Sequence, residues 1–277
     1  MRIIAGAKRG MKLLSPRTDR ATAGRSRHGG PPRQGRRPCQ GACRSRVALT
    51  SVSRPITDRV KESLFSVLYK YDLPDGKIAA DLFCGVGSLG LEALSRGAEF
   101  VTFVEKDPKI IATLKKNIEK AGFAGSSTVS RSGRSNRESP LGDTLLRSGT
   151  PYGGWKAGHG TSRTRARVIR ADAFKIGAPV RLRESAIASA EAIDEQKYDL
   201  VFVDPPYSTT KETKEGSPLS KLLVLLSEQL SPDGIVVVRT EKRTELLEQY
   251  GQLGVIERRQ WGTMAVTILQ RPATARP

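Results

Sequence analysis

The chain reads IAADLFCGVGSLG from Ile78 to Gly90, and this stretch decides the fold. Its first six residues are apolar apart from Asp81, which is typical of a strand buried on both faces of a parallel sheet. Three glycines follow in the spacing G-x-G-x-x-G, and the pattern of residues 89–96 predicts a helix. A strand, a glycine-rich turn and a helix in this order are typical of the first βα unit of a nucleotide-binding sheet.

Strand and helix patterns alternate on both sides of this stretch. They predict further strands at 100–105, 167–170, 198–203 and 235–239, and helices from about 57 and at 108–121, 185–195, 219–230 and 244–250. A turn at 232–234 and a closing antiparallel hairpin at 255–259 and 264–269 complete the pattern. We therefore expect an α/β fold with a mostly parallel sheet and helices on both faces. In such sheets ligands bind beyond the carboxyl ends of the strands, so the candidate site residues lie there.

The charge of the chain is unevenly distributed. Of its 277 residues 47 are Lys or Arg and 28 are Asp or Glu, a formal net charge of +19. Much of the excess lies in two Arg-rich, low-complexity stretches that hold too few apolar residues to form a core. We expect an N-terminal β-hairpin at 1–16, a disordered insert at 17–53, and an α/β domain at 54–277 that carries a second insert at 124–164.

Several classes of protein are excluded at this stage. The longest aliphatic run is Leu222 to Leu226, too short for a transmembrane helix, and early charges at the N-terminus argue against a signal peptide. Three cysteines are too few for a disulfide framework and suit a reducing compartment. We expect a cytoplasmic protein, a monomer, that does not associate with a membrane.

Two nucleotide cofactors fit the first strand ends. Glu105 ends the second strand, where a carboxylate can accept both ribose hydroxyls of either NAD or S-adenosylmethionine. Asp81 favours S-adenosylmethionine, because a carboxylate attracts its ammonium group and would repel the pyrophosphate of NAD. Asp172 follows the third strand, where its side chain could accept the adenine amino group.

The fourth strand ends in Asp204-Pro205-Pro206-Tyr207. The two prolines fix the backbone and remove two N–H donors, which leaves carbonyl acceptors beside the Asp204 carboxylate. An exocyclic base amine donates two hydrogen bonds, and its ring can stack on Tyr207. This combination suits a planar amine as the ligand.

These stretches resemble the RsmD-like family of bacterial 16S rRNA guanine-N2 methyltransferases, which are class I S-adenosylmethionine-dependent enzymes. The resemblance rests on residues 1–6, 54–65, 81–93, 103–106 and 204–207 and covers nearly all of the chain outside the two inserts. It implies a Rossmann-like class I methyltransferase fold, with a mostly parallel seven-stranded sheet, a terminal antiparallel hairpin and an N-terminal β-hairpin. The two inserts depart from the compact family pattern.

The resemblance also implies an activity and its residues. S-adenosylmethionine would methylate the N2 amine of a guanine in 16S rRNA, within the 30S subunit or an assembly intermediate, with no metal. The implied catalytic residues are Asp204, Pro205, Pro206 and Tyr207. The implied cofactor residues are Asp81, Phe83, Gly85, Gly87, Gly90, Glu105, Lys106, Asp172 and Ala173. The implied RNA-binding residues are Arg2, Lys8, Arg9, Lys12, Arg54, Thr57 and Arg59.

Three alternatives stay open from the sequence. The same chemistry could act on another exocyclic amine, such as adenine N6 in DNA or RNA. An NAD-dependent dehydrogenase would account for the glycines and Glu105 but not for residues 204–207. A non-catalytic RNA-binding assembly factor would use the basic inserts and keep a vestigial pocket.

Overall fold

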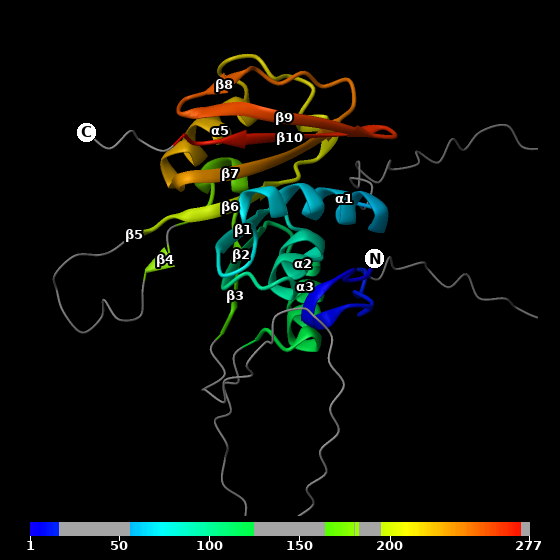
Figure 1. Ribbon diagram of the computed structural model, residues 1–277. Coiled ribbons are helices and arrows are strands. Elements are labelled where there is room, and N and C mark those ends of the chain that lie inside the picture. The colour runs from blue at the N-terminus through cyan, green and yellow to red at the C-terminus, as the bar shows by residue number, and fades with distance from the viewer. Residues whose placement is uncertain (17–55, 125–163, 180, 183–194, 273–277) are drawn as a thin grey trace, which may run out of the picture.

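The computed structural model describes residues 1–16, 56–124, 164–179, 181–182 and 195–272. At its centre is an eight-stranded sheet with the order β3-β2-β1-β6-β7-β10-β9-β8 (Figure 1). The five strands from β3 to β7 in that order are parallel, and the last three are antiparallel to their neighbours. The strands are β1 (Ile78–Leu82), β2 (Phe100–Glu105), β3 (Ala166–Arg170), β6 (Tyr198–Val203), β7 (Leu230–Glu241), β8 (Gln249–Tyr250), β9 (Leu253–Trp261) and β10 (Met264–Gln270). Two short strands, β4 (Arg181–Leu182) and β5 (Glu195–Gln196), pair separately.

Helices cover both faces of the sheet (Figure 1). One face packs against α1 (Asp58–Leu68), α2 (Ser88–Ser95) and α3 (Pro108–Ala121), and the other against α4 (Ala173–Ile176) and α5 (Pro218–Gln229). Successive strand residues alternate between the two cores, so Phe202 faces α1 while Val201 and Val203 face α5. Within the described part of the chain, no helix is long and apolar enough to span a membrane.

The register of the parallel strands brings their carboxyl ends to one edge. Leu82 of β1 lies beside Val104 of β2 and Val203 of β6, and Val203 in turn lies beside Val238 of β7. The residues that follow each of these positions therefore emerge side by side. This edge holds the glycine-rich loop, Glu105, Asp204 and the end of β7.

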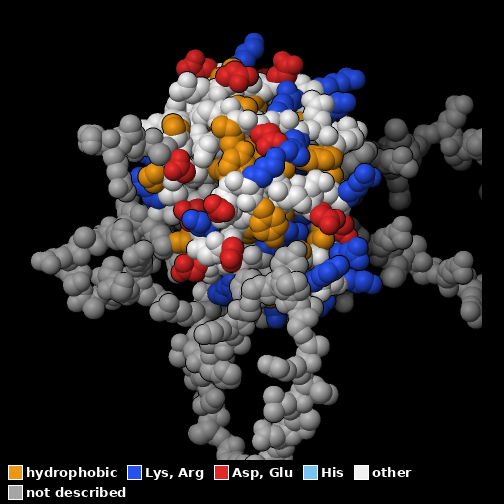
Figure 2. Space-filling view, in the orientation of Figure 1, with side chains coloured by type: hydrophobic (Ala, Val, Ile, Leu, Met, Phe, Trp, Pro, Cys, Tyr) orange, Lys and Arg blue, Asp and Glu red, His pale blue; other side chains and the backbone are white. Residues whose placement is uncertain are grey.

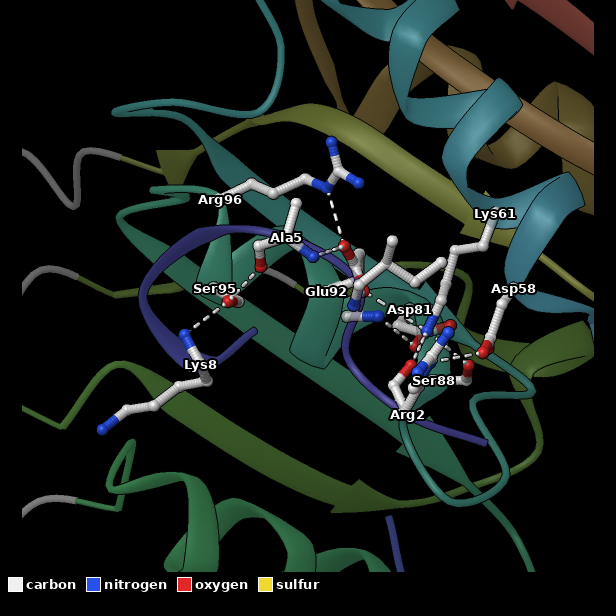
Figure 3. Close-up of polar contacts among 12 residues, drawn as sticks. Arg2, Ala5, Lys8, Asp58, Lys61, Asp81, Ser88, Glu92, Ser95 and Arg96 are labelled. Carbon is white, nitrogen blue, oxygen red and sulfur yellow. Dashed lines mark hydrogen bonds and ion pairs between the residues drawn. The ribbon is translucent and has the colours of Figure 1, made fainter. Parts of the chain in front are cut away.

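The N-terminal segment, residues 1–16, pairs antiparallel with itself as predicted, but forms only an isolated bridge between Arg2 and Lys12 around a 3₁₀ turn at Gly6–Lys8. Its main attachment is to the helices. The buried carboxylate of Glu92 on α2 accepts hydrogen bonds from the N–H groups of Ile4 and Ala5, at 2.7 and 3.0 Å (Figure 3). Gly6 lies so close to Ser95 that a Cβ would fall 1.8 Å from its carbonyl oxygen. The segment is therefore an integral layer over α2 and not a projecting hairpin.

The Rossmann-like fold predicted from the sequence is confirmed, with one strand more than expected because Gln249–Tyr250 adds β8 at the edge. The helix predicted at 244–250 is wrong: residues 244–247 have no regular structure, and Arg258 donates hydrogen bonds to the carbonyls of Lys242 and Thr244. The turn predicted at 232–234 falls within the bounds of β7, at an irregularity where the pairing with β6 jumps from Leu230 to Ile235 and Asp233 has φ +62°. The predicted inserts, apart from residues 124 and 164, and the predicted helix at 185–195, apart from Glu195 in β5, lie outside the described residues.

Candidate active site at the carboxyl edge of the sheet

The three glycines of the loop after β1 serve different purposes. At Gly87, which has φ +84°, a Cβ would lie 2.5 Å from a methyl carbon of Leu114, so this glycine lets α3 pack closely. At Gly90 a Cβ would lie 2.4 Å from the ring of Phe103 on β2. At Gly85, with φ +54°, a Cβ would meet no atom within 4 Å. The first glycine therefore faces space that a ligand could fill, whereas the other two allow helix and sheet to approach.

Asp81 lies beneath this loop. Its residue is 1% exposed, and its carboxylate accepts a 2.8 Å hydrogen bond from the N–H of Gly90. The pKa of Asp81 is raised to about 7, first by burial and then by the negative charges of Asp204 and Glu105, while the Gly90 hydrogen bond and the charge of Arg239 act to lower it. Within the described residues no Lys or Arg forms an ion pair with Asp81. A buried carboxylate without a cationic partner favours a cation in the space above the loop.

Glu105 joins the loop to the end of β2. One carboxylate oxygen accepts a 3.1 Å hydrogen bond from the N–H of Gly85, and the other accepts bonds from the N–H groups of Lys106 and Asp107 at 2.9 and 3.0 Å. The side chain is half-buried, so part of the carboxylate remains accessible to a ligand. Glu105 stands at the place predicted for a ribose-binding carboxylate, while Lys106 is exposed beside it.

The residues after β3 form one wall of this edge. Asp172 begins α4 by accepting a 3.1 Å hydrogen bond from the N–H of Phe174, and Ala173 is buried behind it. Phe83 leaves β1 with φ +57°, and its ring packs against that of Phe174 with centroids 4.8 Å apart. Two half-buried aromatic rings next to Asp172 form an apolar wall suited to a flat group such as adenine.

Asp204 follows β6 and forms a buried ion pair with Arg239 of β7. The Nε of Arg239 donates to Asp204 Oδ1 at 2.6 Å, and the side chains of Arg239 and Asp204 are 3% and 18% exposed. Burial raises the pKa of Asp204 to about 6, although the positive charge of Arg239 and its hydrogen bond act to lower it. Asp204 is therefore a partly accessible carboxylate that titrates near neutral pH.

The two prolines arrange the carbonyls that follow Asp204. The Pro206 carbonyl accepts hydrogen bonds from the N–H and hydroxyl of Thr209, which closes the 3₁₀ turn at Tyr207–Thr209. Within the described part of the chain no donor reaches the Pro205 carbonyl. Tyr207 is half-buried, and its ring centroid lies 6.0 Å from the guanidinium carbon of Arg239. The Pro205 carbonyl and the Asp204 carboxylate are thus two neighbouring acceptors beside an aromatic ring.

The described residues predicted to bind RNA lie on the N-terminal segment and at the start of α1. Arg2 forms a 2.8 Å ion pair with Asp58 at the start of α1, close to Thr57, whose side chain caps that helix. Lys12 is the bridge partner of Arg2, and its carbonyl accepts a hydrogen bond from Lys120 near the end of α3. The remaining positions are the half-buried Lys8, the exposed Arg9 and Arg59, and Arg54, which lies outside the described residues.

On the face seen in Figure 2, positive charge gathers on one side of the described residues. Figure 2 shows Lys and Arg side chains concentrated along the right of the view, where α1 begins and the N-terminal segment lies in Figure 1. The predicted basic positions therefore lie on one broad side of the molecule but reach well beyond the carboxyl edge.

The sequence did not single out two residues that the structure makes prominent. Arg239 ends the apolar run of β7, and a charged residue at that point was the available signal. Glu92 lies among the apolar residues of α2 and is fully buried, yet it binds the N-terminal segment together with Lys61 and Arg96 (Figure 3). The fold alone reveals Asp204, Lys61 and the N-terminal segment as partners, because they come from other elements, whereas Arg96 follows Glu92 by four residues at the end of the same helix.

Comparisons with known proteins agree with this arrangement. The family described as Conserved hypothetical protein 95 matches residues 39–142 and 161–270. The chain is 32% identical over 227 residues to "Putative rRNA methyltransferase YlbH" of Bacillus subtilis, covering 81% of this chain and 91% of that protein. It is 50% identical over 66 residues to "Ribosomal RNA small subunit methyltransferase D" of Haemophilus influenzae, covering 24% and 33% of the two chains.

The fold is also found among solved structures. The structure titled "Putative methyltransferase yhhF from Escherichia coli" superposes with a TM-score of 0.55 at 24% identity and covers 99% of both chains. At that identity the likeness supports the fold, while the family match covers most of the sequence. The chain therefore belongs to the family described as Conserved hypothetical protein 95, the RsmD family of S-adenosylmethionine-dependent methyltransferases.

Proposed function

We propose that this protein transfers a methyl group from S-adenosylmethionine to the exocyclic N2 amine of a guanine in 16S rRNA. The observation that carries the proposal is the pair of acceptors at Asp204 and Pro205, placed at the sheet edge that also holds the glycine-rich loop. Family membership supports methyl transfer as the reaction. The two acceptors support an exocyclic amine, which has two N–H donors, as the group that is methylated.

The cofactor fits the residues of the first three strand ends. The cofactor would lie against the backbone of the loop in the open space at Gly85. Glu105 would accept hydrogen bonds from its ribose hydroxyls. Asp81 lies beneath the loop and would favour the ammonium group through its electric field and not by direct contact. The rings of Phe83 and Phe174 would hold the adenine beside Asp172.

When bound, the cofactor supplies an electrophilic methyl group on a sulfonium. The guanine N2 lone pair is delocalised into the ring, so this nitrogen is a poor nucleophile. Asp204 and the Pro205 carbonyl would accept hydrogen bonds from its two N–H groups and hold the lone pair towards the methyl group. The thioether would leave as a neutral group when the N–C bond forms, and the methylated nitrogen would then lose one proton to water. Most of the rate would then come from positioning and from electrostatic stabilisation of the developing positive charge.

The proposal that the substrate is rRNA is supported by the names of the relatives and by the positive charge of the surface. The names of the relatives in Bacillus subtilis and Haemophilus influenzae specify ribosomal RNA, and the latter specifies the small subunit. The basic side of the molecule suits the phosphate backbone of RNA. A duplex base is inaccessible to Asp204, so the target guanine would lie in a loop or be flipped out of its helix.

The test is methyl transfer from labelled S-adenosylmethionine to 16S rRNA, naked and in 30S subunits that lack the modification, followed by mass spectrometry of the nucleosides. N2-methylguanosine is the expected product, and Asp204→Asn should abolish it while cofactor binding persists. N6-methyladenosine would assign the acceptors to the other amine. Methylation unaffected by Asp204→Asn would remove Asp204 from the mechanism.

A further inference from the structure

Arg239 is a buried cation at the candidate active site. It is the residue after Val238, whose register partner Val203 immediately precedes Asp204. Its Nε donates to Asp204 Oδ1 at 2.6 Å, and its side chain is 3% exposed. The sheet register therefore fixes the two charged groups side by side, so that the pair does not depend on a flexible loop.

The hydrogen bonds of Arg239 are incomplete. Its Nη1 is buried and has no hydrogen-bond partner within the described part of the chain. Taking a guanidinium out of water is costly unless its donors are satisfied, so a purely structural arginine would be expected to use more of them. The main polar interaction of Arg239 is with Asp204, which points to a role in controlling that carboxylate.

We propose that Arg239 is a positioning residue for methyl transfer, which orients the Asp204 carboxylate and keeps it ionised as the acceptor for the substrate amine. This inference rests on the proposed function. From its fixed place on β7, Arg239 binds one carboxylate oxygen of Asp204. The second carboxylate oxygen then remains available to the substrate amine. Arg239 is not itself a catalytic residue, because its contact is with Asp204.

Burial opposes the ionisation of Asp204, and Arg239 favours it. Asp81 on β1 is the neighbouring carboxyl group, and the negative charges of Asp204 and of Glu105 on β2 raise its pKa. Arg239 on β7 lowers the pKa of Asp204 against the effect of burial, and Tyr207 contributes a neutral ring. Loss of the Arg239 charge should therefore raise the pKa of Asp204 above about 6, by one pH unit or more.

The experiment compares Arg239→Gln and Arg239→Lys in the full-length chain, with Arg259→Gln as the matched control. Arg259 also pairs with a carboxylate, that of Glu257, but it lies on β9 away from Asp204. In Arg239→Gln, the acid limb of the rate profile should move upward by about one pH unit, so that kcat should fall about twofold at pH 7 and about fivefold at pH 6. Arg239→Lys should keep the midpoint near that of the wild type, and Arg259→Gln should change neither.

A second measurement separates this inference from the proposed function. Carboxyl ¹³C NMR of the protein without substrate, with Asp204 assigned by comparison with Asp204→Asn, reports its pKa directly. An upward shift in Arg239→Gln supports the inference whatever base is methylated. An unchanged Asp204 pKa, or a loss of rate that is equal at every pH, would overturn it. If Arg239→Gln does not fold, the same titration in Arg239→Met decides by the same criterion, because methionine also removes the charge and keeps an unbranched apolar side chain at this buried place.

Discussion

The N–H of Gly90 donates a 2.8 Å hydrogen bond to Asp81 Oδ2, which ties the first turn of α2 to the buried carboxylate of β1. The same glycine packs against Phe103 of β2, so its missing side chain is what allows this contact. The loop between Asp81 and Gly90 is thereby held at both ends, and Gly85 between them faces open space.

Gly90→Ala should destabilise the fold and weaken cofactor binding. The new Cβ would lie 2.4 Å from Phe103 Cε1 and 3.0 Å from Asp81 Oδ2, and Phe103 is buried in the core. Overpacking of this kind costs about 1–3 kcal/mol. Urea denaturation would measure the loss and calorimetry the affinity for S-adenosylmethionine. Gly254→Ala on β9, where a Cβ meets nothing within 4 Å, is the control and should change neither.

Asp81→Asn should weaken cofactor binding and remove its pH dependence. The amide oxygen can still accept from Gly90, but it carries no charge to attract an ammonium group. Because the pKa of Asp81 is raised to about 7, the wild type should bind the cofactor less tightly as the pH falls below 7 and should release a proton on binding. Calorimetry from pH 5.5 to 8.5 in buffers of different ionisation enthalpy tests this, and a proton release that persists in Asp81→Asn would contradict it.

Asp81→Asn, which should weaken cofactor binding, should increase the stability of the folded protein near neutral pH. The folded protein holds the Asp81 proton up to about pH 7, whereas the unfolded chain loses it near pH 4, so the wild type loses stability over that window as the pH rises. Asp81→Asn avoids this cost. The melting temperature of the variant, relative to that of the wild type, should therefore increase from pH 4 to pH 7, and a constant difference would show that Asp81 does not titrate in this range.

Much of the site could be predicted because strand order and motif spacing fix it. Glu105, Asp172 and Asp204 each end or follow a predicted strand, and parallel strands bring such residues to one edge. Long-range polar partners could not be predicted: Asp204 and Arg239 are 35 residues apart, and Glu92 binds backbone atoms 87 and 88 residues away. Sequence periodicity carries no information about such pairs.

The wrong helix at residues 244–250 has a physical explanation. The stretch contains good helix formers, but a helix of seven residues is not stable by itself. Here tertiary contacts determine the backbone: Tyr250 pairs into β8, its hydroxyl accepts from the N–H of Leu247, and Arg258 binds the carbonyl of Thr244. Local propensity was outweighed by contacts with the end of the sheet.

Glu92→Gln should destabilise the protein strongly. The carboxylate is fully buried, pairs with Arg96 at 2.8 Å and Lys61 at 3.3 Å, and accepts two backbone hydrogen bonds from the N-terminal segment (Figure 3). Neutralising it leaves two buried cations without a counter-charge, which typically costs about 3–5 kcal/mol. Denaturation should show this loss, while Glu119→Gln, exposed on α3, should stay close to the wild type. Equal stability of the two variants would show that Glu92 does not anchor the segment.

The basic residues of the N-terminal segment should contribute to RNA affinity through charge. Replacing Lys8, Arg9 and Lys12 by Gln should weaken rRNA binding and reduce the slope of log K against log salt by about one for each phosphate that is no longer neutralised. Fluorescence anisotropy with an rRNA fragment at several salt concentrations measures the slope. Lys221→Gln, exposed on α5 across the sheet, is the control, and an equal effect from it would show that the charge acts without a preferred surface.

The most direct test of the account is the methylated nucleoside formed by the wild type and by Asp204→Asn on small-subunit rRNA lacking the modification. The account predicts N2-methylguanosine from the wild type and none from the variant, with both proteins still binding S-adenosylmethionine. N2-methylguanosine formed at equal rates by both would contradict the assigned role of Asp204. Absence of any methylated nucleoside with wild-type protein that binds the cofactor would contradict the proposed substrate.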